Sequence, residues 1–433
     1  MYLTMVKQWF STLYHTVWRR HLMRSGLITA LILALVLIGL AAAYRQHMQG
    51  KFHLLKLKAN IETQQEDSHI PRPGGQEPIV LTRAQTMGDS LPEFLSATML
   101  PGRGMNVLQI TAYIPGKGEV KLLASPTAEA AARMMTGKGA DADGEASLTM
   151  GGAFEVPWAA RIWGTPAQEG GHISTVWRGH TITLPAAAID DASVAGDGLM
   201  LATPSDSAQT AALPDGGDAE AVFHAGDFRG HWPSKTDVTV TVLLSSRSID
   251  LTIEAHNTGD AAEPIGIGWH PRFAILDGNR QQMRLRVPGS MRLDVRNHDQ
   301  GQPTGALLPV AGTPFDFAMD RGARLGTMDL DDCFVALRQN LLDNGPIAEL
   351  SDPSNNYGIR LIALSPTIKA MRVVAPERGD FVSIGPQLNY DDPFGREWGK
   401  NIDTGMVVLQ PKQSVQWKVR LEVFSLTGPA APL

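Results

Sequence analysis

The feature that most constrains this fold is an alternation of apolar and polar residues that recurs along the chain beyond about residue 80. A period of two is typical of strands with one buried face, and Gly, Pro, Asn and Asp between the segments indicate turns. The clearest segments are NVLQITAYI (106–114), HTITLP (180–185), DVTVTVLL (237–244), SIDLTIEAHN (248–257), MRLRVPG (283–289), YGIRLIAL (357–364), AMRVVAP (370–376) and SVQWKVRLEVF (414–424).

Helical periodicity is scarce by comparison. The best case is PTAEAAARMMTGKG (126–139), which Gly137 or Gly139 would end. Many strands and few helices predict an all-β fold, a large antiparallel β-sandwich that takes in the carboxy-terminal three quarters of the 433 residues as one unit.

Charge and cysteine content exclude several classes of function. With 38 basic and 44 acidic side chains, the net charge of -6 gives no basic field for a polyphosphate backbone, so nucleic acid is not an expected partner. Cys333 is the only cysteine, which excludes an intramolecular disulfide and a zinc cluster of thiolates. No cofactor and no metal are expected.

The amino-terminal segment predicts a membrane anchor. Between Arg24 and Arg45 lie 20 uncharged residues, about the number that spans a bilayer core. We expect an uncleaved, single-pass helix in the inner membrane, with the amino terminus in the cytoplasm and the main domain on the periplasmic side. Cleavage after the small residues Ala41 and Ala43 is the alternative.

Four parts of the chain follow from this prediction. Residues 1–24 form a cytoplasmic juxtamembrane segment, 25–44 the transmembrane helix, 45–80 a linker rich in Pro and Gly towards its end, and 81–433 the sandwich domain.

Two polar residues stand in apolar surroundings, and a sandwich core has no need of either. Arg161 in GGAFEVPWAARIWG offers a rigid fork for neighbouring hydroxyls, or else stacks on Trp158 or Trp163 for packing. His270 in EPIGIGWHPRFAI precedes Pro271, which favours a strand end, and its imidazole can donate a proton. A histidine held only for packing is the alternative.

A third polar group follows the carboxy-terminal strands. Aspartates 331 and 332 stand in LDDCFVAL, and FVSIGPQLNYDDPFGREW carries Gln387, Asn389, Asp391 and Asp392 among aromatic residues. Aromatic faces with amide and carboxylate edges suit a sugar ring, although a plain loop of turn-forming residues would look similar.

A metal interpretation rests on His224, Asp227 and His231, which are spaced for zinc only if helical. Gly226 and Gly230 disfavour that helix.

Taken in order, these stretches resemble the aldose 1-epimerase (galactose mutarotase) family from about Leu91 to Phe424. The resemblance is carried by GGAFEVPWAARIWG, NTGDAAEPIGIGWHPRF, VAGTPFDF (310–317) and LDDCFV. It implies a galactose mutarotase-like supersandwich, with Arg161 and Asp331 contacting the sugar and His270 as the acid. The family interconverts the α and β anomers of a free sugar: a carboxylate takes the proton of the C1 hydroxyl while the histidine protonates the ring oxygen.

The sequence departs from the family at two positions. Gly385 stands where the family has its basic glutamate, two residues before Gln387. A second histidine is also missing, and its best match is Asp197 in VAGDGLML. Asp197 is therefore a candidate substitute base, as are Asp391 and Asp392.

Three functions stay open on these grounds: a membrane-tethered epimerase with a displaced carboxylate, a degenerate member that binds a sugar or a polysaccharide end without turnover, and an envelope scaffold. The membrane is the other expected partner, through residues 25–44.

Overall fold

The computed structural model describes residues 70–168, 170–187, 193–298, 301–319 and 322–427. The predicted juxtamembrane segment, transmembrane helix and most of the predicted linker lie outside these residues. Within the described ranges, no helix is long and apolar enough to cross a membrane. The compact unit runs from Pro71 to Leu433, so it starts ten residues before the predicted domain boundary at 81.

The larger of two main sheets has twelve strands within the described residues. Its order is β1 (Ile79–Thr82), β2 (Glu93–Leu100), β3 (Asn106–Ile114), β5 (Gly152–Glu155), β16 (Gly268–Pro271), β26 (Phe381–Gln387), β25 (Ala370–Ala375), β22 (Leu330–Leu337), β19 (Gly289–Val295) and β20 (Pro303–Pro309). Off this path, β4 (Gly118–Lys121) pairs with β3, and β17 (Phe273–Ala274) pairs with β26.

The second main sheet has nine strands in the described part of the chain. They follow the order β11 (Ser207–Leu213), β12 (Gly216–Gly226), β13 (Thr236–Leu244), β14 (Ser248–Asn257), β28 (Ser414–Ser425), β24 (Tyr357–Ala363), β23 (Ile347–Asp352), β18 (Arg284–Arg286) and β21 (Ala323–Arg324).

Short elements complete the described residues. The small sheets are β7 (Thr165–Pro166), β8 (His172–Trp177) and β9 (His180–Pro185); β6 (Arg161–Trp163) with β10 (Val194–Gly196); and β15 (Glu263–Ile265) with β27 (Val407–Leu409). The α-helix α2 is Ala128–Met134, and 3-10 turns lie at Pro73–Gly75, Gly88–Ser90, Pro101–Arg103, Gly139–Asp141, Glu145–Thr149, Leu276–Gly278 and Arg280–Gln282.

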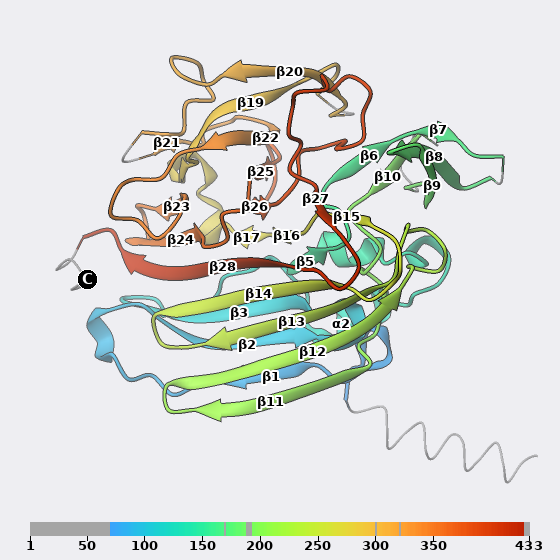
Figure 1. Ribbon diagram of the computed structural model, residues 1–433. Coiled ribbons are helices and arrows are strands. Elements are labelled where there is room, and N and C mark those ends of the chain that lie inside the picture. Colours follow the sequence, from blue (N-terminus) through green and yellow to red (C-terminus); the bar gives the residue numbers. More distant parts are fainter. Residues whose placement is uncertain (1–69, 169, 188–192, 299–300, 320–321, 428–433) are drawn as a thin grey trace, which may run out of the picture. The chain divides into compact units, whose positions relative to one another are not determined.

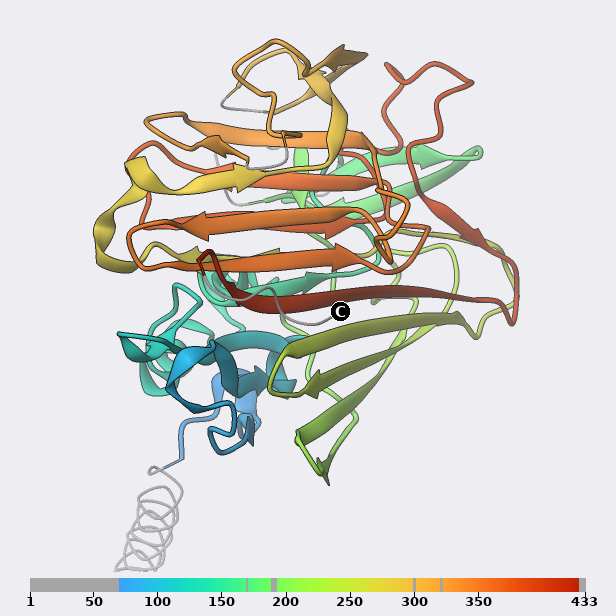
Figure 2. The same cartoon turned by 90° about the vertical axis from the view of Figure 1, so that its left-hand side faces the viewer.

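The two main sheets share one hydrophobic core, which makes the unit sandwich-like. Strands β1 to β3 lie behind β11 to β14 in Figure 1, and the orange carboxy-terminal strands lie above the green ones in Figures 1 and 2. Each sheet therefore continues from one half of the chain into the other. Strand β13 shows the basis: Val238, Val240 and Val242 are fully buried between half-buried polar neighbours. Burying each such side chain stabilises the fold by about 1.5–3 kcal/mol.

The predicted strands are confirmed to within one or two residues for most segments. NVLQITAYI, HTITLP and SIDLTIEAHN coincide with β3, β9 and β14. The one predicted helix is α2, which Thr127 caps by accepting a hydrogen bond from the amide of Ala130 and which ends before Gly137.

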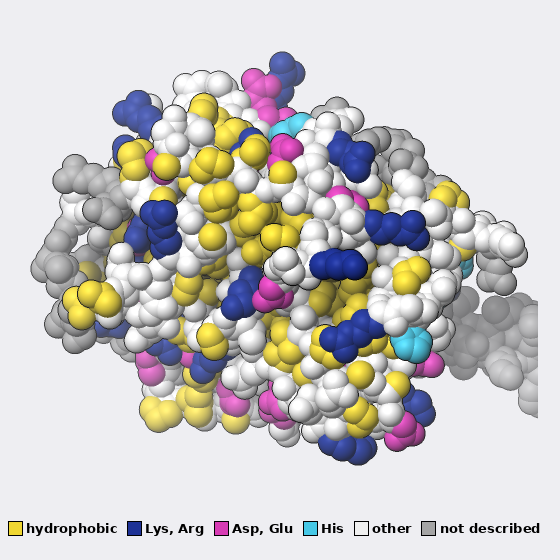
Figure 3. Space-filling view, turned by 45° about the horizontal axis from the view of Figure 1, so that its top comes forward, with side chains coloured by type: hydrophobic (Ala, Val, Ile, Leu, Met, Phe, Trp, Pro, Cys, Tyr) yellow, Lys and Arg dark blue, Asp and Glu magenta, His cyan; other side chains and the backbone are white. Residues whose placement is uncertain are grey.

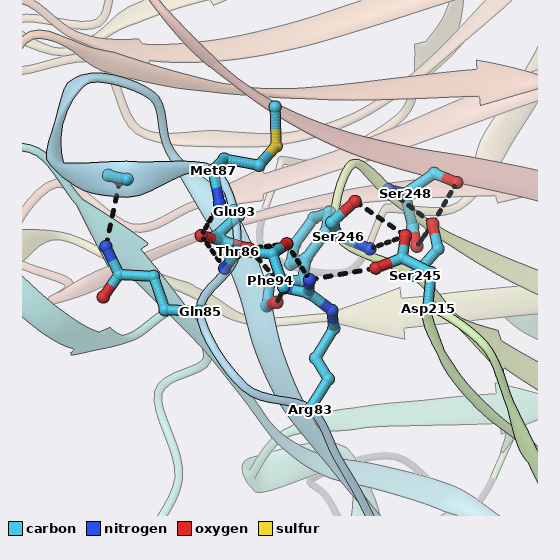
Figure 4. A network of polar contacts seen from close by, with 11 residues as sticks. Arg83, Gln85, Thr86, Met87, Glu93, Phe94, Asp215, Ser245, Ser246 and Ser248 are labelled. Carbon is cyan, nitrogen blue, oxygen red and sulfur yellow. Dashed lines mark hydrogen bonds and ion pairs between the residues drawn. The ribbon is translucent and has the colours of Figure 1, made fainter.

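Arg83 connects the first strands to the green hairpins through a buried polar network (Figure 4). Its guanidinium pairs with the fully buried Glu93 and, at 2.9 Å, with Asp215. Asp215 in turn accepts hydrogen bonds from the amide and hydroxyl of Ser246, in the turn between β13 and β14. The network thus joins the edges of both sheets.

Replacing Arg83 with Met is expected to lower the free energy of unfolding by about 3–5 kcal/mol, because it leaves the Glu93 carboxylate buried without its cation. Denaturant titration measures this. The control is Arg72→Met, whose partner Glu77 is exposed, and which should cost about 0–1 kcal/mol. Equal effects of the two substitutions would contradict the importance of burial at Arg83.

Candidate active site

The site is built on the larger sheet where its two halves meet. Gly268 of β16 pairs with Glu155 on one side and with Gln387 of β26 on the other, and His270 pairs with Ala153 of β5. Paired residues in antiparallel strands, and residues two apart along one strand, point to the same face of a sheet. Glu155 and His270 therefore share a face, and Glu155 Oε1 lies 3.7 Å from His270 Nδ1.

Arg372 lies on β25, the strand next to β26, and its side chain is on this same face of the sheet. It pairs with Gly385 of β26 and Cys333 of β22. Its guanidinium donates to Asp331 Oδ1 at 2.5 and 3.1 Å and to Asp391 Oδ2 at 3.2 Å. A nearly buried cation thus bridges two carboxylates beside His270.

Arg161 and Asp197 arrive from the small sheet of β6 and β10. Gly196 pairs with Arg161, and the amide of Asp197 donates to the Ala160 carbonyl at 2.8 Å, so Asp197 lies beside Arg161. Arg161 Nη2 is 3.2 Å from Asp331 Oδ2. The backbone of Asp197 is left-handed, with φ of 43°. Aspartate tolerates this conformation better than most residues.

Burial controls protonation in this cluster. Burial and then the charge of Arg372 lower the pKa of His270 to about 3, so its imidazole is neutral at pH 7. Burial and then Asp197 raise the pKa of Glu155 well above its ordinary value. Burial also raises the pKa of Asp197. For Asp331, burial raises the pKa, but Arg372 and Arg161 outweigh it and hold the value below the ordinary one.

The cluster therefore contains four carboxyl groups and two guanidinium groups, and the carboxyl groups titrate as a group. They belong to Glu155, Asp197, Asp331 and Asp391, and the guanidinium groups to Arg161 and Arg372. Burial raises the pKa of Glu155 and of Asp197, whereas the arginines keep the pKa of Asp331 below its ordinary value. Carboxyl groups whose pKa values are pushed apart in this way are typical of sites that use acid-base catalysis.

A cavity of about 1000 Å³ adjoins this cluster. Arg161 and Asp197 line it together with Trp163, Phe228 and several residues of 140–149. Glu155, His270 and Asp331 are not among the lining residues. Ligand pockets typically hold about 300–1,000 Å³, so this one is large for a single sugar ring.

A family model for aldose 1-epimerase matches residues 210–422, which include His270, Asp331 and Gly385. Maltose epimerase of Levilactobacillus brevis is 27% identical over 142 residues, which are 30% of this chain and 39% of that enzyme's length.

Solved structures show the same fold. A galactose mutarotase-like protein from Clostridium acetobutylicum matches with a TM-score of 0.62 and 15% identity, over 76% of this chain and 92% of that one. Galactose 1-epimerase from Lactobacillus acidophilus matches with a TM-score of 0.55 and 17% sequence identity, over 80% of this chain and 98% of that one. The chain therefore has the galactose mutarotase-like fold and is similar in sequence to aldose 1-epimerases over residues 210–422.

The structure brings four of the predicted site residues together and leaves two of them enclosed within the fold. His270, Arg161, Asp331 and Asp197 come together as described above. Gln387 and Asn389, expected to contact the sugar, are 2% and 0% exposed. The Asn389 amide is held by the backbone of Ala159 at 2.9 and 3.0 Å, and Gln387 Nε2 donates to the Asn389 carbonyl at 2.7 Å. The Asn389 amide thus binds the loop before Arg161, and the Gln387 amide holds the backbone of Asn389, so both side chains already have partners within the fold.

The other two candidates for a substitute base, Asp391 and Asp392, already bind partners within the fold. Asp391 pairs with Arg372. Asp392 accepts from the amide of Trp163 at 3.0 Å, and burial raises its pKa to about 8. Asp197 is therefore the candidate with both a place in the cavity wall and a position among the charged residues.

The spacing that suggested a zinc site has another explanation. His224 lies on β12 and contacts Asp237 at 3.1 Å, while His231 bonds the Thr183 carbonyl at 2.7 Å. Among the described residues, no group of three or more His, Cys, Asp or Glu is arranged to hold a metal ion.

Sequence reasoning missed Glu155 and Arg372 as members of the site. Both lie within strands that are buried along most of their length. A charged residue inside such an apolar strand was the available signal, because a buried charge needs a partner.

Gly385 has no room for a side chain. A Cβ placed there would lie 2.7 Å from the Trp269 carbonyl oxygen of the neighbouring strand. The backbone of β16 thus fills the space where the family's glutamate would begin.

Gly385→Ala is expected to lower the free energy of unfolding by about 1–3 kcal/mol, as overpacking does. Thermal or denaturant unfolding measures it, with Gly399→Ala as the control, because the contact nearest to a Cβ at Gly399 is 4.0 Å away. An unchanged stability for Gly385→Ala would show that β16 can move aside.

Proposed function

We propose that this protein binds a reducing sugar in the cavity beside Arg161 and Asp197 and interconverts its α and β anomers. The observation that carries the proposal is Asp197, a half-buried carboxylate in the cavity wall, placed next to the arginine that pairs with Asp331. It returns a carboxylate to a site whose usual base is replaced by Gly385.

The chemistry follows from these positions. Asp197 takes the proton of the C1 hydroxyl, and His270 donates a proton to the ring oxygen as the bond from C1 to that oxygen breaks. Because His270 does not line the cavity, the sugar ring has to extend beyond it to the accessible part of the His270 side chain, which is 17% exposed. Rotation about C1–C2 and reclosure give the other anomer. Each general acid or base of this kind contributes about 10²- to 10⁴-fold. Arg161 is 30% exposed, so it can also donate to a sugar hydroxyl.

The size of the cavity favours a sugar chain over a single ring. We propose the reducing end of an oligosaccharide or polysaccharide as the ligand, with Trp163 and Phe228 offering apolar faces to sugar rings. The face in Figure 3 carries both basic and acidic side chains with apolar ones between them.

Polarimetry tests the proposal. The full chain is added to freshly dissolved α-glucose, α-galactose and α-maltose at pH 7, and the change in optical rotation is compared with the spontaneous rate. We expect acceleration, greatest for the disaccharide. Saturable binding by calorimetry without acceleration would contradict epimerase activity.

That second outcome describes the alternative function, a sugar-binding protein without turnover. Gly385 favours it, because the usual base is absent and the strand packing leaves no space for it. Absence of both binding and turnover would leave a scaffold.

Anchoring in the inner membrane is proposed on the 20 uncharged residues at 25–44 alone. Fractionation of cells should find the full chain in the membrane and a variant lacking 25–44 in the soluble fraction. Protease added to intact cells should cleave the main domain only after the outer membrane is permeabilised. Recovery of the full chain in the soluble fraction would refute the anchor.

A further inference from the structure

His270 has a buried carboxylate as its neighbour on the sheet. Glu155 reaches His270 Nδ1 from β5, the strand next to β16, at 3.7 Å. Its second oxygen accepts the amide of Ala160 at 2.9 Å, which fixes the carboxyl group in place. Gly268 leaves room for it, since a Cβ there would lie 3.0 Å from Glu155 Oε2.

Glu155 is enclosed, so it cannot touch a sugar in the cavity directly. Its side chain is 4% exposed and that of His270 is 17% exposed. Any effect of Glu155 on the reaction therefore passes through the imidazole. Because Nδ1 faces Glu155, Nε2 is the ring nitrogen left for the sugar.

We propose that Glu155 is a positioning residue and proton partner for His270: it holds the ring with the hydrogen on Nε2 and gives a proton to Nδ1 when Nε2 donates to the sugar. This inference rests on the proposed epimerase function. The gap of 3.7 Å must close by less than about 1 Å to form a hydrogen bond, and contacts of this kind often shorten when substrate binds.

The step balances in protons and charge. Asp197 takes the C1 hydroxyl proton, and the electron pair of that O–H bond forms the carbonyl as the C1–ring oxygen bond breaks. The ring oxygen receives the Nε2 proton, and Nδ1 receives the Glu155 proton. The imidazole stays neutral overall, Asp197 becomes neutral, and Glu155 becomes the anion. Reclosure on the other face reverses every transfer.

The charges around the pair fit this role. The charges of Asp197, after β10, and Asp391, after β26, raise the pKa of Glu155, and the charge of Arg372 on β25 lowers it. Burial, the largest effect, raises the pKa of Glu155 well above its ordinary value, which favours the protonated form that the relay requires.

His270 faces a second set of charges, namely Arg372, Arg272, Asp331 and Arg161. Burial and the three arginines lower the pKa of His270 and outweigh Asp331, which raises it, so the imidazole stays neutral, the form that a relay requires. A histidine without a proton partner would have to carry a full charge change in this enclosed position, which is costly.

Two measurements test the proposal. First, ¹⁵N NMR of histidine-labelled full chain, assigned with a His270→Gln sample, should show the wild-type ring protonated at Nε2 and accepting at Nδ1. Second, Glu155→Gln keeps an oxygen for the Ala160 amide but has no acidic proton. It should lower kcat for anomer interconversion about 100-fold, with KM unchanged.

The pH profile separates a proton role from a structural one. As pH rises through the pKa of Glu155, the wild type should lose activity, since the proton for Nδ1 is gone. Glu155→Gln should lack this alkaline decline. Glu263→Gln is the matched control: Glu263 is fully buried and accepts from Thr236 at 2.8 Å, but it lies on β15, outside the charged cluster. It should leave kcat and the profile unchanged.

The outcomes are distinct. A wild-type ring protonated at Nδ1 alone, or a Glu155→Gln variant with normal kcat and a normal alkaline decline, would overturn the role of Glu155. If the wild type accelerates no sugar, the proposed function fails instead, while the NMR signals of His270 still report whether Glu155 contacts the ring. A Glu155→Gln variant that does not fold leaves the wild-type NMR result to decide.

Discussion

Replacing Asp197 with Asn is expected to reduce the rate of anomer interconversion by about 10²- to 10⁴-fold, because Asn cannot take the proton of the C1 hydroxyl. Asn is close to Asp in size and tolerates the same left-handed backbone, so the fold and the hydrogen bond to Ala160 should persist. Polarimetry gives the rate, and calorimetry should show sugar binding within a few-fold of the wild type.

The matched control for this prediction is Asp294→Asn. Asp294 is also half-buried and accepts from Thr304 at 2.8 Å, but it lies on β19 and does not line the cavity. Its variant should keep the wild-type rate. An Asp197→Asn variant that is as fast as the wild type would show that another group removes the proton.

Replacing Arg372 with Met is expected to lower the free energy of unfolding by about 3–5 kcal/mol. Arg372 is 7% exposed and holds Asp331 and Asp391 together, so its loss leaves the buried Asp391 without its cation and leaves Asp331 with Arg161 alone. Denaturant unfolding at pH 7 measures the change. Adding Asp391→Asn to the variant should recover part of it, because the buried charge that lost its cation is then gone.

The effect of Arg372 should depend on pH in a defined direction. Although burial raises the pKa of Asp331, Arg372 and Arg161 hold it below its ordinary value near 3.8. A lowered pKa in the folded state contributes stability above the unfolded value and loses it as pH falls through the folded value. The difference between wild type and Arg372→Met should therefore shrink below about pH 4.

Arg360→Met is the control for Arg372. Arg360 also pairs with two carboxylates, Glu349 and Glu422, but its side chain is 33% exposed. Water screens such pairs, and the expected loss is about 0–1 kcal/mol. A loss at Arg372 no greater than at Arg360 would contradict the view that the buried cation holds the site together.

The extent of the most regular strands could be predicted because it depends on local pattern. Alternation along β13 places one side chain in two in the core, and a one-residue change of register would expose the whole set. The same pattern could not say which strands pair. Strand β16 lies between β5 and β26, more than 100 residues away in each direction.

This difference explains the result at the candidate site. His270, Arg161 and Asp331 could be selected from their sequence surroundings, because short motifs around them resemble the family. Glu155 has no such motif, and it reaches His270 only because β5 and β16 are neighbours. Gln387 and Asn389 were expected to contact the sugar, but their amides already make hydrogen bonds within the fold. The sequence shows that a residue is polar and does not show whether its hydrogen bonds are already made.

The sequence by itself therefore determined the all-β class, the extent of the most regular strands, and His270 and Gly385 as the positions where the chain matches and departs from the family pattern. Only the tertiary structure decided which carboxylates surround that histidine and which of them can reach the cavity. The physical reason is that strand periodicity arises between neighbouring residues, whereas protonation depends on burial and on charges brought close by strand pairing. Glu155, His270 and Asp197 acquire their chemistry from one another across three strands or strand ends.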